Sequence, residues 1–127
     1  DNTSYEGGYD VRGTLHIEVG CYTVHTDNFY FATGVLYRFL EQLIECYETL
    51  NGEAKYKHLL ENDLEFTLEM TSLGHALVRG AFQENSAKAN VLHFEMETDQ
   101  TCLKSVIKDI KNVMNIFGDY LGLKKHP

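Results

Sequence analysis

The fold is decided by residues 64–82, which read LEFTLEMTSLGHALVRGAF. From Leu64 to Met70 every second residue is apolar and alternates with Glu or Thr, which is the period of a strand with one buried face. Residues 72–74 predict a tight turn into a second alternating run that ends at Phe82. Two strands joined by so short a turn must be antiparallel, because a parallel pair needs a long crossover connection.

Further alternating runs lie on both sides of this hairpin. Residues 92–97 repeat the pattern, and residues 15–25 contain two more runs separated by Gly20. We expect the first strand to begin at Gly13 and Asp27-Asn28 to form a loop. Together these runs predict about five to six antiparallel strands.

Two other segments carry the three- and four-residue spacing of amphipathic helices. The first is predicted at residues 34–50, with Thr33 as its N-cap and Asn51-Gly52 as its stop. The second begins after Asp99, whose carboxylate suits a helix N-terminus, and is expected to end at Gly122. The apolar face of the sheet needs cover, and the helices can supply it. The predicted fold is therefore α+β, an antiparallel sheet with two amphipathic helices packed on one face.

Length and composition indicate a single globular unit. The chain has 127 residues, of which 43% are apolar and 24% charged, as in ordinary domains. We expect residues 1–12 to form a flexible N-terminal arm, residues 13–122 a single α+β domain, and residues 123–127 a C-terminal tail.

The net charge indicates which classes of partner to expect, and the cysteines indicate the cellular compartment. Nineteen acidic and eleven basic side chains give a net charge of −8, which argues against nucleic acid and against an anionic membrane surface. No run approaches the roughly 18 apolar residues of a membrane-spanning helix. Cys21, Cys46 and Cys102 are odd in number and widely spaced, which favours a reducing compartment. We therefore expect a cytoplasmic protein.

The alternation leaves the second face of the sheet polar. Burying unpaired carboxylates there would cost about several kcal/mol for each charge, so this face must meet water or a partner. The predicted partner-binding face consists of Glu65, Glu69, Glu95 and Glu97.

No pattern in the sequence points to catalysis or metal binding. Glu65 and Glu69 are about 13 Å apart along one strand, too far to act as one site. His16 and His25 can face each other across a hairpin, but a zinc site needs three or more converging ligands. Cys102 lies in the first turn of a helix without an identified base. We predict no catalytic residue, no metal site and no cofactor.

One pattern runs from Phe31 through Phe39, Leu40 and Leu43 to Asn51-Gly52 and continues in residues 64–68, Gly74-His75, residues 78–80, residues 92–94 and residues 99–103. This pattern resembles that of the WapI-type immunity proteins, a bacterial family. The resemblance covers residues 29–121, and its most specific part is the helix start that follows a strand. The family more often has a larger side chain at the position of Cys102.

The resemblance implies a small, non-enzymatic protein that binds and neutralises a cognate polymorphic toxin. Toxins that act on nucleic acid tend to be basic, and an acidic sheet face can steer such a partner. Two alternatives remain open. One is a small-ligand-binding or enzymatic domain with its site between sheet and helices, and the other is a structural homo-oligomer that pairs through strand edges.

Overall fold

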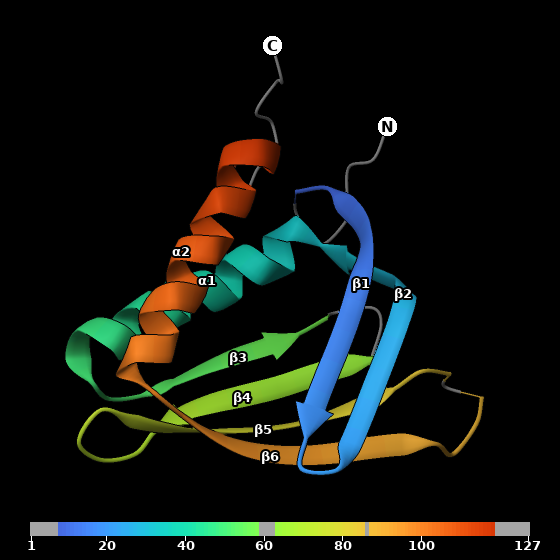
Figure 1. The fold of residues 1–127 in the computed structure, drawn as a ribbon. Helices are drawn as coiled ribbons and strands as arrows, with labels where there is room; N and C mark the ends of the chain where they lie inside the picture. Colours follow the sequence, from blue (N-terminus) through green and yellow to red (C-terminus); the bar gives the residue numbers. More distant parts are fainter. Residues whose placement is uncertain (1–7, 59–62, 86, 119–127) are drawn as a thin grey trace.

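The computed structural model describes residues 8–58, 63–85 and 87–118. Within these ranges the chain forms six strands and two helices, all shown in Figure 1. The strands are β1 (Asp10–Val19), β2 (Tyr22–Ala32), β3 (Glu53–Lys57), β4 (Leu64–Met70), β5 (His75–Gln83) and β6 (Val91–Asp99), and the helices are α1 (Thr33–Thr49) and α2 (Gln100–Phe117). The predicted α+β class, with antiparallel strands and two helices, is confirmed.

The strands divide between two antiparallel sheets. β1 and β2 form a long hairpin, and the other four strands form a sheet in the order β3-β4-β5-β6. The helices and the hairpin lie on one side of the four-stranded sheet, with the hairpin crossing its strands (Figure 1). None of the described helices and strands lies over the opposite side of that sheet (Figure 1).

The core lies between the four-stranded sheet and the elements above it. Phe39 of α1 meets Phe66 and Tyr56 edge-on, with ring centroids 5.2 and 6.2 Å apart. Leu43 is fully buried on the same helix face, and Leu103 is 2% exposed on α2. Each buried side chain of this size contributes about 1.5–3 kcal/mol, so the apolar periodicity of both helices is explained by this contact.

Helix α1 begins differently from the prediction. The predicted N-cap at Thr33 is wrong, because Ala32 occupies the cap position and makes no side-chain capping bond. The Thr33 hydroxyl instead accepts a hydrogen bond from the backbone N–H of Tyr9 at 2.9 Å. At the other end Leu50 adopts a left-handed φ of 54° and its N–H donates to Cys46 O at 2.8 Å. The helix therefore stops just before Asn51-Gly52, as predicted.

The hairpin also corrects two expectations. β1 begins at Asp10, before the predicted start at Gly13. The predicted loop at Asp27-Asn28 is wrong, because both residues lie inside β2. The pairing register shifts between Gly13 and Leu15, so one residue of β1 stands opposite two of β2. A bulge of this kind accommodates turn-forming residues without ending the strand.

Helix α2 has the predicted start and a different end. Asp99 is the N-cap, and its carboxylate accepts a hydrogen bond from the Cys102 N–H at 3.0 Å. The predicted end at Gly122 is wrong, because α2 stops at Phe117 with Gly118 as its C-cap. Gly122 lies outside the described residues, as do residues 1–7 of the predicted arm and the whole predicted tail. Among the described residues, no helix combines the length and apolar character needed to cross a membrane.

Candidate functional site

The uncovered face of the four-stranded sheet brings the four predicted glutamates onto one surface. Glu65 and Glu69 lie on β4 and Glu95 and Glu97 on β6, all four exposed, with β5 between the two strands. We call this surface the outer sheet face. Its members are Glu53, Lys55, Lys57, Glu65, Thr67, Glu69, Leu77, Arg79, Ala81, His93, Glu95 and Glu97.

Two of the four glutamates have basic partners on the same face. Arg79 stands opposite Glu95 in the strand register, and its Nε donates to Glu95 Oε1 at 2.7 Å. This hydrogen bond and the adjacent negative charge raise the pKa of Arg79. Lys57 Nζ lies 3.9 Å from Glu65 Oε2. The sequence interpretation missed both cations, because cross-strand neighbours are set by register and not by local spacing.

The other two glutamates share a row without a cation. Glu53, Glu69, Leu77 and Glu97 follow one another across β3, β4, β5 and β6. Among the described ion pairs, none includes Glu69 or Glu97. Two strand spacings place their backbones about 10 Å apart, with Leu77 between them. We call Glu69, Leu77 and Glu97 the acidic row.

The acidic row borders a concave part of the surface. A depression of about 350 Å³ is lined by Leu77 and Glu97 together with Ser72, His75 and their neighbours. Leu77 is half-buried and forms an apolar centre between two exposed carboxylates. Such an arrangement suits a partner with basic side chains around an apolar contact, since binding surfaces combine a desolvated centre with a polar rim.

The carboxylate of Asp99, at the end of β6, caps the N-terminus of α2. The hydrogen bond from the Cys102 N–H at the start of α2 holds the pKa of Asp99 below its ordinary value. The negative charge also matches the positive end of the helix dipole. Asp99 is therefore engaged by its own chain.

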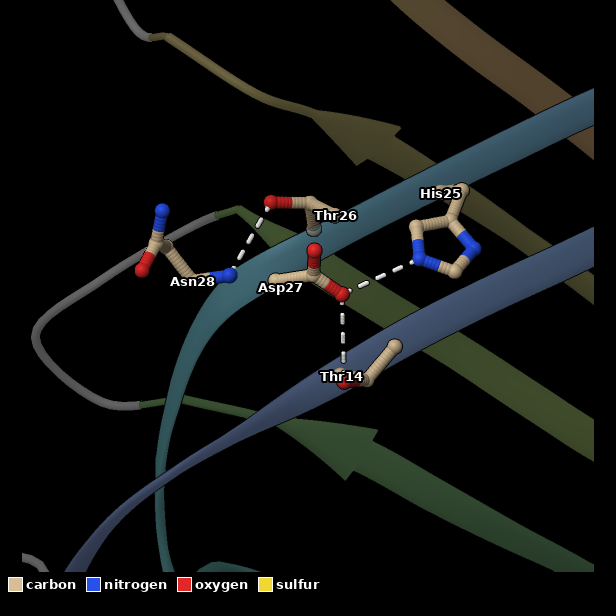
Figure 2. A network of polar contacts seen from close by, with 5 residues as sticks. All are labelled: Thr14, His25, Thr26, Asp27 and Asn28. Carbon is tan, nitrogen blue, oxygen red and sulfur yellow. Dashed lines mark hydrogen bonds and ion pairs between the residues drawn. The ribbon is translucent and has the colours of Figure 1, made fainter.

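The β1–β2 hairpin contains a polar cluster around Asp27. Asp27 Oδ1 lies 3.1 Å from His25 Nε2 and accepts a 3.4 Å hydrogen bond from the Thr14 hydroxyl (Figure 2). His16 and His25 do face each other, with ring centroids 5.6 Å apart. Among the described residues, however, no group of three or more His, Cys, Asp or Glu side chains is arranged to hold a metal ion. The cluster is explained by the bulge, whose polar side chains satisfy one another.

A separate cavity of about 450 Å³ opens between β1, α2 and the inner face of the sheet. Its walls are largely apolar, and Cys102 and Val106 line it on the α2 side. This is where the alternative with a site between sheet and helices places its ligand. His93 lies on the outer sheet face and is not among the residues that line this cavity.

The comparison with known proteins identifies a family. A family model described as the immunity protein WapI-like family matches residues 1–118. The chain belongs to the immunity protein WapI-like family. The WapI-like match includes the β1–β2 hairpin, part of which precedes the segment that carried the resemblance in the sequence. Membership of the WapI-like family supports a toxin-neutralising role in general. No curated protein and no solved structure matches the chain.

Proposed function

We propose that this WapI-like chain is a non-enzymatic immunity protein that binds a cognate bacterial toxin in the cytoplasm and neutralises it through the outer sheet face. The observation that carries the proposal is the acidic row, where Glu69 and Glu97 lie exposed beside Leu77 without a described ion-pair partner. Glu97 and Glu69 make no described ion pair, although the charge of Glu69 also helps to raise the pKa of Arg79 at longer range. Both carboxylates are exposed and can meet basic groups of a partner. Glu65 and Glu95 already have basic partners within the chain, so we assign them a supporting position at the edge of the contact.

The chemistry of the face favours a basic toxin, such as a nuclease. A net charge of −8 attracts a basic protein over a distance of about one Debye length and raises its association rate. A toxin that binds nucleic acid presents Lys and Arg to phosphates, and carboxylates about 10 Å apart can occupy the same groups. Binding at these groups would cover the surface with which the toxin binds its substrate.

Co-expression with the toxin encoded beside the gene tests the proposal. We expect the wild-type chain to co-purify with this toxin and to protect cells that produce it. The variant Glu69→Gln/Glu97→Gln should lose co-purification and protection, because it removes the unpaired charges while keeping the shape of the side chains. The control Glu41→Gln/Glu45→Gln removes the same charge from the exposed side of α1 and should behave as wild type. Full protection by the Glu69→Gln/Glu97→Gln variant would reject the outer sheet face as the toxin-binding surface.

The apolar cavity supports a second candidate function, which is the binding of a small apolar molecule. Its volume of about 450 Å³ lies in the usual range of ligand pockets. An environment-sensitive naphthalene sulfonate dye should then bind saturably and be displaced by decanoate. Val106→Asp, which puts a charge at the cavity wall, should abolish this binding. A dye signal that does not saturate, or that survives Val106→Asp, would exclude the cavity as a ligand site.

A further inference from the structure

A groove between the two helices has a charge opposite to that of the whole chain. It has a volume of about 670 Å³ and is lined by residues of α1 and α2. Both helices lie on the side of the sheet opposite the outer sheet face (Figure 1). Ile44 and Tyr47 of α1 and Ile107 of α2 supply apolar side chains to its lining. The lining also includes one carboxylate, Glu48 of α1, against three lysines of α2. We call it the lysine groove, because its α2 side carries Lys104, Lys108 and Lys111.

The three lysines form one stripe along α2. Steps of four and three residues place them on the same helix face, over about 10 Å of the axis. All three are exposed, and among the described residues no carboxylate lies within ion-pair distance of any of them. Lys104 and Lys108 are four residues apart, so their like charges repel and slightly disfavour the helix. The stripe therefore does not serve the stability of α2 through internal ion pairs.

We infer that the lysine groove is a docking site for an acidic amphipathic segment of a partner protein. Carboxylates of the segment meet the lysine stripe, and its apolar side chains pack on Ile44, Tyr47 and Ile107. An amphipathic helix in a groove between two helices is the simplest form of such a contact. The site is independent of the proposed toxin contact, since the outer sheet face selects a basic surface and lies on the other side of the sheet.

The same features argue against nucleic acid as the occupant. Three lysines release few counterions, and the net charge of −8 repels a polyanion as a whole. A short protein segment avoids most of that repulsion because its carboxylates are confined to the stripe. The apolar lining adds a contact that a phosphate backbone cannot use.

Peptide display against the full-length protein tests the inference. Short helix-forming peptides are selected on the wild type alone, and the affinity of the selected peptides is measured by fluorescence anisotropy. We expect peptides with Asp or Glu on one face and apolar residues on the other. Their affinity should fall at least about tenfold for Lys104→Glu/Lys111→Glu.

Two further variants separate a groove from general charge attraction. Arg12→Glu/Lys88→Glu makes the same change in net charge at exposed positions outside the groove and should retain the peptides. Ser105→Trp keeps every lysine but fills the groove, and it should weaken binding as well. Three outcomes would overturn the inference: no selected peptide, selected peptides without acidic residues, or equal loss of affinity in the Arg12→Glu/Lys88→Glu control. An oligothymidylate probe that binds the wild type and loses affinity in the lysine variant would also overturn it.

Discussion

Gly80 lies at the centre of the four-stranded sheet, where its lack of a side chain allows two aromatic rings to approach. It stands between Phe66 on β4 and Phe94 on β6, on the inner face. A Cβ added at Gly80 would lie 2.5 Å from Glu65 O, 2.6 Å from Phe66 Cβ and 2.6 Å from Phe94 Cζ. The Phe94 ring can move, but the Glu65 carbonyl belongs to the backbone of a paired strand. Gly80→Ala must therefore displace β4 from β5.

The expected cost follows from this overlap. Overpacking of a well-filled core costs about 1–3 kcal/mol. With an unfolding entropy of about 2.1 cal/mol/K per residue, a chain of 127 residues loses roughly 4 °C in Tm for each kcal/mol. We therefore predict that Gly80→Ala lowers Tm by about 4–11 °C.

Gly13→Ala is the matched control, since Gly13 also lies in a strand. Its added Cβ would be 3.6 Å from Phe31 Cε1, an ordinary van der Waals contact. Replacing a strand glycine without strain restricts the unfolded chain, so this variant should equal or exceed the wild type by up to about 1 kcal/mol. Circular dichroism follows both melts, because the chain has no tryptophan. A Gly80→Ala variant that melts at or above the wild-type Tm would refute the packing described for the sheet.

Three further predictions concern the cap, the thiols and the ion pair of the outer sheet face. Asp99→Ala should lower Tm at neutral pH. The difference in Tm from wild type should shrink as the pH falls through the lowered pKa of Asp99, because a carboxylate with a depressed pKa in the folded state stabilises the fold only while it is ionised. A difference in Tm that does not depend on pH would contradict this prediction. In a disulfide-exchange assay Cys21 and Cys102 should react rapidly, and Cys46 should react only when the protein unfolds. Burial is the main cause that raises the pKa of the Cys46 thiol, and the charges of nearby glutamates raise it further. Rapid reaction of all three thiols would contradict a closed core. Arg79→Gln should speed association with a basic toxin at low salt, because it removes a cation from the outer sheet face; an unchanged rate would place the contact elsewhere.

Local sequence patterns were sufficient for most individual elements. The alternation from Leu64 to Met70 predicted β4, and the capping chemistry of Asp99 predicted the start of α2. Both depend on residues close together in the chain. The division of the strands into two sheets was not predictable in this way, because alternation reports that a strand is half-buried and not which strand lies beside it.

The errors at element ends have a common physical cause, which is tertiary structure overriding local preference. Asp27-Asn28 has turn chemistry, but Thr26 and Phe29 on either side pair with β1 and keep these two residues in a bulged strand. Thr33 is a good N-cap residue, yet its hydroxyl accepts a hydrogen bond from the backbone N–H of Tyr9. In both cases a partner from a distant segment decided the outcome.

The candidate site was predicted in composition but not in its charge balance. The alternation of side chains along each strand was sufficient to predict that Glu65, Glu69, Glu95 and Glu97 lie on one face of the sheet. The positions of Lys57 and Arg79 opposite two of them required the register of β3 to β6. The register shows that Glu65 and Glu95 have basic neighbours on the same face and that Glu69 and Glu97, in the acidic row, have no described ion pair.

We propose that Glu69 and Glu97 on the outer sheet face bind the cognate toxin. The most direct test is the Kd of the purified toxin for the wild type and for Glu69→Gln/Glu97→Gln, measured by titration calorimetry at several salt concentrations. We expect the variant to bind about two- to thirtyfold more weakly at low salt, because each of two exposed ion pairs is worth about 0.2–1 kcal/mol. The two affinities should converge towards about 0.5 M salt, where exposed charges are screened. Equal Kd values at low salt would contradict the proposal.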